Sequence, residues 1–562
     1  MKKQRSNNGQ SFIYGAAIMV ISTAIVKVLG AVFRIPLTYL IHEKGMGFYS
    51  TAYDLYLPIY ALAMAGLPVA VSRITAEFVQ KNRYNDVRKT LKIAQKAFLV
   101  TGLTGFFLML LIIYPFIKIT GNDGALFGML AIAPSVLFCC IMSSYRGYYE
   151  GLRNMYPTAI STIIEAAGKL VLGYGFAYGV IAYYGEVNTK SASLAAAAAL
   201  LGITLGTAFS AIYLIIRHKS TGDNITAEML ASSEPAESGK SILKSLIAIS
   251  IPVVLGSLVT NIASLIDVTM VQWQLDNAVK NSPEVFRNLY GDILKETTDA
   301  EIPNYLYGVY KGYAFTLYNL VPTITSVIGV SALPVLAMAW TKNEKPEIKK
   351  NVETMVKVTG LVAIPCGIGL IALAEPILNL LYDADSISIS TKILQILGAT
   401  AIFAGIMSPL NNMLQAIGKQ WVPVRNIAVG ATIKIVVNFI LVGIPEINII
   451  GAPIGTLCCY IYIALSNMIC IIKYSKVKPK VFSILFKPLI AAFVCGGAAY
   501  FANLALAGNI SSKISTVVAI MVAALVYVVM LIVLKAFTEE DILAFPKGEK
   551  LASLLKKAKI LR

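Results

Sequence analysis

Histidine and charged residues are scarce in this chain of 562 residues. It has two histidines, His42 and His218, and charged residues make up 14% of the sequence against 57% for hydrophobic residues. A soluble domain is close to half apolar and about a quarter charged, so this composition excludes an ordinary soluble fold. Two histidines are also too few for a His-based metal site.

The cysteines and the familiar catalytic motifs do not indicate an enzyme. The seven cysteines all lie in apolar segments without metal-type spacing, and we expect them to be small core residues. They are Cys139, Cys140, Cys366, Cys458, Cys459, Cys470 and Cys495. A phosphate-cradling glycine loop, HExxH and GxSxG are all missing from the sequence. We therefore expect a protein without cofactor, metal or catalytic activity.

Long apolar runs fill most of the chain. A hydrocarbon core of about 30 Å needs roughly 20 apolar residues per helix, and this template predicts an all-α polytopic membrane protein with fourteen transmembrane helices. The first helix carries Lys27 and Arg34 and lacks a clean cleavage site, so we expect it to be retained rather than removed as a signal sequence. The expected spans are 11–40, 48–79, 93–117, 125–146, 157–184, 192–216, 242–272, 305–340, 354–381, 391–417, 422–443, 449–472, 482–507 and 513–536.

The net charge of +18 comes from short loops between the apolar runs, not from a basic domain. Lys and Arg collect in cytoplasmic loops, so this distribution indicates membrane orientation rather than nucleic-acid binding. Alternate loops hold the basic residues, which predicts that both termini are cytoplasmic. These loops contain Lys81, Arg83, Arg88, Lys89, Arg146, Arg153, Arg217, Lys219, Lys240, Lys244, Lys342, Lys345, Lys349, Lys350, Lys419, Arg425, Lys473, Lys476, Lys478 and Lys480.

One stretch of the sequence occurs twice. SYRGYYEGLRNMYPTAISTIIEAAGKLVLG at 144–173 and PLNNMLQAIGKQWVPVRNIAVGATIKIVVN at 409–438 share a polar turn and a long apolar helix, and a shift of 265 residues puts Lys169 on Lys434. The repeat unit has an even number of helices, which predicts two parallel six-helix lobes around a central cavity, plus two C-terminal helices. The expected divisions are an N-lobe at 1–218, a cytoplasmic linker at 219–241, a C-lobe at 242–475, two final helices at 476–537 and an amphipathic tail on the inner leaflet at 538–562.

Four cations are expected inside the membrane: Lys27, Arg34, Lys169 and Lys434. A charge at this depth costs at least ~2.5–3.5 kcal/mol, so it usually faces a cavity or a partner. Lys169 could instead pair with Glu165 one turn earlier, whereas Lys434 has no acid one turn away on either side. A cavity lined by cations should attract an anion such as a phosphate or diphosphate. We therefore predict that these four residues bind a diphosphate.

Other ionisable residues lie nearer the helix ends. Asp54, Asp267 and Lys311 are expected near the outer ends of their helices, where Asp267 could form a gate pair with Arg34 or Lys311, or simply a structural salt bridge. The remaining candidates lie at the cytoplasmic ends and could serve packing and topology or an inner gate. They are Arg73, Glu77, Arg146 and Glu150.

Several segments resemble a known family. KVLGAVFRIPLTYLI, GMGFYSTAYDLYLPIYALAMAGLPVAVSR, RGYYEGLRNMYPTAIS and LQAIGKQWVP are similar to the polysaccharide-export branch of the MOP superfamily, in particular to the group of stage V sporulation protein B, YtgP and the MurJ-type lipid II flippases. The resemblance covers essentially the whole chain. It implies a flippase of the bacterial plasma membrane that moves an undecaprenyl-diphosphate-linked cell-wall precursor, in the first place lipid II, to the outer leaflet by alternating access.

The resemblance also implies site residues and partners. Lys27 matches the family's basic residue before Leu-Gly, and Arg34 approximately matches its next arginine, which lies near the diphosphate. Lysine at position 27 loses the bidentate fork that an arginine would offer. The implied partners are a lipid-linked oligosaccharide and membrane lipids, with no nucleic acid. Cell-wall synthesis enzymes could be further partners, and we expect the chain to act as a monomer.

Three alternatives remain open. A cation- or drug-extruding antiporter of the same superfamily would need an acid in the first helix, and residues 11–41 contain none. A membrane glycosyl- or phosphotransferase would need a polar loop that holds a metal, and 273–304 has acids without histidine. A flippase for another lipid-linked glycan, such as a capsule or spore-wall unit, would have the same sequence features as a lipid II flippase.

Overall fold

The computed structural model describes residues 12–64, 66–382, 384–507, 510–534 and 536. Within these residues all regular structure is helical, and eleven helices are long and apolar enough to cross a membrane. This confirms the predicted all-α polytopic membrane fold, while the count of fourteen transmembrane helices stays a prediction. The helices group into two compact units: Met1–Asp276 with Asp299–Gly308, and Asn277–Thr298 with Val309–Arg562. The predicted lobe boundaries stay a prediction.

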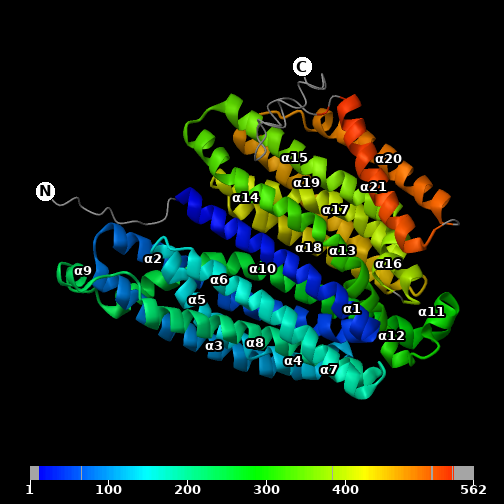
Figure 1. Cartoon of the computed structure of the whole chain (residues 1–562), viewed down its shortest axis with the longest axis horizontal. Coiled ribbons are helices and arrows are strands. Elements are labelled where there is room, and N and C mark those ends of the chain that lie inside the picture. Colours follow the sequence, from blue (N-terminus) through cyan, green and yellow to red (C-terminus); the bar gives the residue numbers. More distant parts are fainter. Residues whose placement is uncertain (1–11, 65, 383, 508–509, 535, 537–562) are drawn as a thin grey trace. The chain divides into compact units, whose positions relative to one another are not determined.

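The first unit is built from a bent first helix and the helices packed around it (Figure 1). Helix α1 bends at His42, whose φ of 51° and ψ of −165° are not helical. The unit comprises α1 Phe12–Met64, α2 Leu67–Gln80, α3 Tyr84–Thr120, η1 Asp123–Ala125, α4 Leu126–Ile132, α5 Ser135–Gly151, α6 Tyr156–Gly168, η2 Lys169–Gly173, α7 Tyr174–Tyr184, α8 Thr189–Thr221, α9 Ala227–Ala231, α10 Gly239–Asn281 as far as Asp276, η4 Asp299–Glu301 and α12 Ile302–Gly308.

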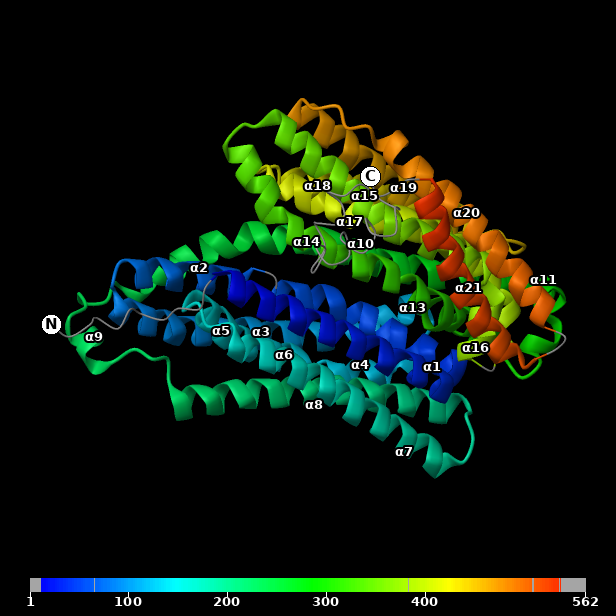
Figure 2. The same ribbon diagram turned by 45° about the horizontal axis from the view of Figure 1, so that its top comes forward.

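Glycines allow α8 to lie directly against the backbone of α6 and η2. A Cβ placed on Gly202 would lie 2.2 Å from the Cα of Gly173, and one on Gly206 would lie 2.7 Å from the Glu165 carbonyl oxygen. Small residues permit such close helix contacts in membranes. At this contact the helix that begins as α6 changes from α to π geometry, over Lys169–Gly173. Figure 2 shows α7 continuing beside α8 beyond this segment.

The second unit has its own hydrophobic core, centred on α14, α15, α17 and α19. Its last two helices, α20 and α21, pack side by side and α20 also packs on α15 (Figure 1). The unit comprises α11 Pro283–Tyr290, η3 Gly291–Leu294, η5 Val309–Ala314, α13 Phe315–Tyr318, α14 Leu320–Thr341, α15 Lys345–Ala372, α16 Ala374–Leu381, α17 Ile387–Ala416, α18 Trp421–Val442, η6 Asn448–Ile450, α19 Gly451–Ser475, α20 Val481–Leu506 and α21 Ser512–Val533.

The repeated sequence segment adopts the same helix boundaries in both copies. Helix α5 ends at Gly151 and α6 begins at Tyr156, whereas α17 ends at Ala416 and α18 begins at Trp421. Both boundaries are separated by the 265 residues found in the sequence comparison. The two copies therefore share a helix–turn–helix unit, although few of their residues are identical.

The backbone of the turn is repeated as well. Arg153 has a φ of 58° and Gly418, its counterpart, has a φ of 76°. In each copy the next N–H donates to the carbonyl oxygen five residues earlier, at 2.9 Å and 2.8 Å. A left-handed residue with this hydrogen bond is a Schellman helix end. A second pair of such ends lies at Asn82 and Asn343, each with a φ of 57°.

Candidate functional site

A cavity of about 330 Å³ lies among the helices of the first unit. Helices α1, α5, α6 and α8 and the π-helix η2 contribute to its walls. Most of its polar lining comes from the repeated segment, and most of its aromatic lining comes from the second arm of α1. The lining residues are Val26, Gly30, Tyr53, Tyr56, Tyr60, Arg146, Thr162, Glu165, Ala166, Lys169 and Ile203.

Arg146 and Glu165 form an ion pair in this cavity. The Nη2 atom of Arg146 lies 3.0 Å from Oε2 of Glu165, and the two side chains are 9% and 25% exposed. The guanidinium also donates to the hydroxyls of Ser161, at 2.8 Å, and Ser210, at 3.3 Å. It thereby connects α5, α6 and α8 through charge-assisted hydrogen bonds. The sequence analysis placed Arg146 at a helix end, and the structure places it in the cavity.

Lys169 does not form the ion pair with Glu165 that the sequence left open as an alternative. Its Nζ lies 4.9 Å from the centre of the Phe33 ring and 5.3 Å from the centre of the Tyr53 ring. Within the described chain Lys169 forms these two cation–π contacts and no ion pair within 4 Å. It is the first residue of the π-helix η2, and π segments in helices are frequent at functional sites. Aromatic faces stabilise the ammonium there without using its three N–H donors.

A row of tyrosines forms the aromatic wall. Tyr49, Tyr53, Tyr56 and Tyr60 are spaced four, three and four residues apart on α1, which keeps them on one face of the helix. Successive ring centroids are 5.9, 5.9 and 5.3 Å apart. Tyr53 and Tyr60 are half-buried, whereas Tyr56 is buried and its hydroxyl lies 3.6 Å from the Cys139 sulfur. The helical spacing of the tyrosines could have indicated this wall from the sequence.

Of the other two predicted cations of the first unit, Arg34 is near Lys169. Arg34 follows Phe33 on α1, and its like charge acts on Lys169. Lys27 is half-buried on α1 and is not among the residues that line the cavity. A shared role of Lys27 with Arg34 and Lys169 stays a prediction.

Lys434 belongs to the second unit, where it is half-buried on α18. The positions that match Arg146 and Ser161 at the 265-residue shift are Asn411 and Asn426. Asn467 on α19 donates to Asn411 at 2.7 Å and accepts from Asn426 at 2.9 Å, and Arg425 donates to Asn426 at 3.0 Å. The two repeats thus carry a three-helix polar cluster at equivalent places, with an arginine–glutamate pair in the first and three amides contacted by an arginine in the second.

Of the predicted outer residues, two are in the first unit and one is in the second. Asp54 is buried and accepts a hydrogen bond from the Tyr307 hydroxyl on α12 at 2.7 Å. Asp267 is buried on α10. Lys311 is buried in the second π-helix, η5, with Nζ 4.7 Å from the centre of the Phe315 ring. Both π segments therefore hold a lysine against aromatic rings.

The candidates at the other end of the helices lie on α2 and α5, and their role in packing and topology or in an inner gate stays a prediction. Arg73 and Glu77 are exposed on α2, and Glu77 pairs with Lys81 at 2.7 Å. Glu150 is half-buried at the end of α5. Within the described residues there are no groups of histidine, cysteine and acidic side chains that could hold a metal.

Comparison with known proteins identifies the family. The family model "Polysaccharide biosynthesis protein" matches residues 12–340, which is more than half of the chain. The chain belongs to this family. A second family model, "Lipid II flippase MurJ", matches residues 309–519.

Two curated relatives match most of the chain. Stage V sporulation protein B of Bacillus subtilis is 23% identical over 96% of this chain and 98% of its own length. Lipid II flippase MurJ of the same organism is 22% identical over 82% of both chains.

The fold of this family member agrees with solved transporter structures. A MurJ structure, "inward closed conformation", has a TM-score of 0.63 at 14% identity and covers 92% of this chain and 98% of that chain. A multidrug resistance MATE family transporter of the MOP superfamily has a TM-score of 0.55 at 15% identity, with 80% and 99% covered. The resemblance to the MOP superfamily, and within it to the sporulation protein B and MurJ group, is confirmed.

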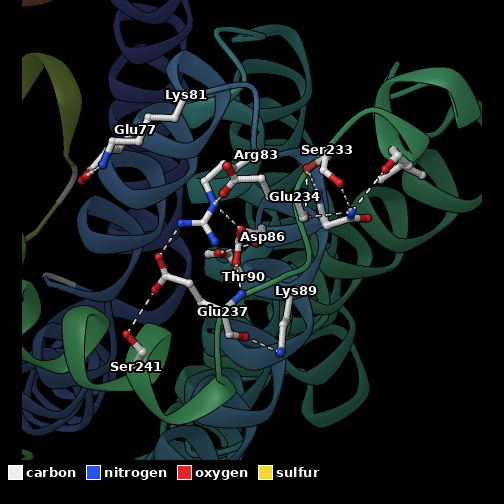
Figure 3. A network of polar contacts seen from close by, with 12 residues as sticks. Glu77, Lys81, Arg83, Asp86, Lys89, Thr90, Ser233, Glu234, Glu237 and Ser241 are labelled. Atoms are coloured by element: carbon white, nitrogen blue, oxygen red, sulfur yellow. Dashed lines mark hydrogen bonds and ion pairs between the residues drawn. The ribbon is translucent and has the colours of Figure 1, made fainter.

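A polar network in this family member ties residues 233–241 to the start of α3 (Figure 3). The Asp86 carboxylate forms an ion pair with the guanidinium of Arg83, at 2.8 Å, and accepts a hydrogen bond from the backbone N–H of Glu237, at 2.7 Å. Arg83 also donates to the Glu237 carboxylate at 2.7 Å, and Lys89 donates to the Glu237 carbonyl oxygen. The predicted linker is therefore fastened to the first unit.

A second contact holds the other end of the same segment. Asp223 pairs with Arg88 at 3.3 Å and accepts a hydrogen bond from the Tyr148 hydroxyl at 2.8 Å. Burial opposes ionisation of Asp223, but the hydrogen bonds from Arg88, Tyr148 and the backbone N–H of Ile225 outweigh it. Together they hold the pKa of this carboxyl below its usual value.

Proposed function

We propose that this protein is a flippase that moves an undecaprenyl-diphosphate-linked cell-wall precursor, lipid II, from the inner to the outer leaflet. The observation that supports this function best is the Lys169 ammonium, held on aromatic faces beside Arg34 with its three N–H donors unused by the described residues. Such donors at this depth suit an anion that is brought into the membrane region. The names of the MurJ relative and of the matching family model agree with this substrate class.

In this proposal the cations bind the diphosphate without any covalent step. Lys169, Arg34 and Lys27 would contact it from the first unit and Lys434 from the second, as the two lobes alternate between inward and outward access. Asp54, Asp267 and Lys311 would help to close the substrate pathway on the outer side of the membrane. We propose that both termini are cytoplasmic, which labelling of single cysteines in the loops from outside the cell would test.

The deciding experiment is rescue in cells depleted of other lipid II flippases. Head-group accessibility of lipid II at the outer surface is measured with this protein present and absent. Restored exposure supports the proposal. No rescue by protein that is demonstrably in the membrane would contradict lipid II as the substrate.

Lys434→Ala is a second test of the same proposal. We expect it to lower lipid II exposure without loss of protein from the membrane, because it removes one of the cations assigned to the diphosphate. Normal transport at normal abundance would remove Lys434 from the mechanism.

A flippase for another lipid-linked glycan is the second candidate. It is favoured by the similarity to stage V sporulation protein B along 98% of that protein's length. In the rescue experiment this candidate predicts no lipid II exposure. It predicts restored export of a spore-wall or capsule glycan in cells that lack the corresponding flippase.

A further inference from the structure

The cavity of the first unit contains an acid as well as cations. The Glu165 carboxylate accepts from Arg146 through Oε2 at 3.0 Å, and its Oε1 has no donor within the described chain. A diphosphate carries oxygen acceptors and negative charge only, so it offers nothing to a carboxylate and is repelled by it. An anion alone therefore does not account for Glu165 in this wall.

The other polar groups of the cavity both donate and accept. The hydroxyls of Tyr53 and Tyr60 are half-buried and form no hydrogen bond with the described residues, and the Lys169 ammonium keeps its donors. The rings of Tyr53, Tyr56 and Tyr60 supply the aromatic part of the same lining, and Lys169 lies over the Tyr53 ring. Small-molecule sites combine aromatic walls with a few convergent polar groups, and their usual volume of about 300–1,000 Å³ includes the 330 Å³ found here.

Sugars have the chemistry that this combination requires. A pyranose presents hydroxyl groups that donate and accept, and one of its faces carries C–H groups that pack on aromatic rings. A sugar attached to a phosphate adds the negative charge that suits Lys169. The acid, the aromatic wall and the cation then each have a partner on one ligand.

We propose that this cavity binds the sugar that is attached to the diphosphate of the lipid-linked substrate. Oε1 of Glu165 accepts from a sugar hydroxyl, Tyr53 and Tyr60 pack on the ring and bond its hydroxyls, and Lys169 contacts the phosphate end. This inference rests on the proposed function and adds selectivity for the sugar inside the first unit. The second repeat has Gly430 at the position that matches Glu165, so the proposal assigns sugar recognition to the first repeat.

The test compares two lipids on the purified full-length chain: undecaprenyl diphosphate, and the same lipid carrying one N-acetylhexosamine. We expect the sugar-bearing lipid to bind about three- to tenfold more tightly, which is the range of one aromatic contact. Glu165→Gln, which preserves shape and can still accept from Arg146, should remove most of this preference. Tyr60→Leu should reduce it, and Tyr60→Phe should retain the part that comes from ring packing.

The controls separate recognition from folding. Tyr183→Leu makes the same change at an exposed tyrosine on α7 and should leave the preference intact. Affinity for the bare diphosphate lipid should rise in Glu165→Gln, because the carboxylate that repels it is neutralised, whereas loss of a merely structural contact would lower the affinity for both lipids. Equal binding of both lipids to the wild type, or a preference that survives Glu165→Gln, would overturn the inference alone. Binding of neither lipid would overturn the proposed function with it.

Discussion

The Nζ atom of Lys169 lies 4.9 Å from the centre of the Phe33 ring, where the first turn of a π-helix faces the first arm of α1. The contact connects the repeated segment to the first helix, which carries Lys27 and Arg34. The ring faces stabilise the ammonium form of the side chain, which has no ion-pair partner within 4 Å in the described chain. The cation is held by uncharged groups and remains available to a ligand.

Lys169→Ala should lower transport by at least about tenfold, because one charge-assisted contact to the substrate is worth about 1.5–3 kcal/mol. Lys169→Arg keeps the charge and should retain part of the activity. The measurement is outward exposure of the lipid-linked substrate at equal protein abundance. Lys118→Ala is the matched control, since Lys118 also lies over a ring, that of Tyr114, at an exposed position outside the cavity. Full activity of Lys169→Ala would contradict the assigned role.

Arg146→Ala should destabilise the first unit by about 1–3 kcal/mol, since it leaves Glu165 and two serine hydroxyls without their donor. The measurement is the midpoint of thermal unfolding in detergent. Adding Glu165→Gln to Arg146→Ala should recover part of the loss, because the orphaned carboxylate is then neutral. If the double variant is no more stable than the single one, the ion pair is not the source of the effect.

Gly202→Ala should destabilise the protein by about 1–3 kcal/mol, the usual cost of overpacking. The added Cβ would lie 2.2 Å from the Cα of Gly173, and backbone cannot move aside as a side chain can. Gly175→Ala is the control, because nothing lies within 4 Å of its added Cβ and alanine is the better helix former. Unfolding midpoints that fall equally for both variants would show that α8 does not touch the π-helix.

Asp223→Asn should loosen the segment near residue 223 from α3, while the contacts of Glu237 with Arg83 and Asp86 still hold the other end. The native pKa of Asp223 is lowered, so this carboxyl stabilises the folded state above its unfolded pKa of about 3.9, and the contribution is lost as the pH falls through the lower native value. A spin label at the exposed position 228 should be immobile at neutral pH and become mobile only when the pH falls below that lowered native pKa. Asp223→Asn should be mobile already at neutral pH, and an immobile label in that variant would count against the contact.

The fold class and the repeated helix–turn–helix unit could be predicted from the sequence, because hydropathy and the 265-residue repeat depend on residue type alone. The bonding partner of each charged side chain could not be predicted from the sequence. Lys169 lies one turn from Glu165, yet the carboxylate bonds to Arg146, since the rotation of α5 against α6 is decided by helix packing. The sequence did offer one signal for this pair: Arg146 and Glu165 carry opposite charges and lie on either side of one tight turn. The π geometry at Lys169–Gly173 occurs where α8 approaches through Gly202, a tertiary contact that the sequence alone does not show.

Helices α10 and α12 belong to the first unit, and this affects what happens when the chain is cut into two fragments. Gln272 on α10 donates to Thr51 at 2.5 Å, and Asn304 on α12 accepts from Asn122 at 2.8 Å, so both helices bond to partners that precede the linker. If the gene were cut within residues 222–238, the downstream fragment would still carry helices that complete the upstream one. The two fragments should then co-purify when expressed together, because the peptide linker is not what joins these parts.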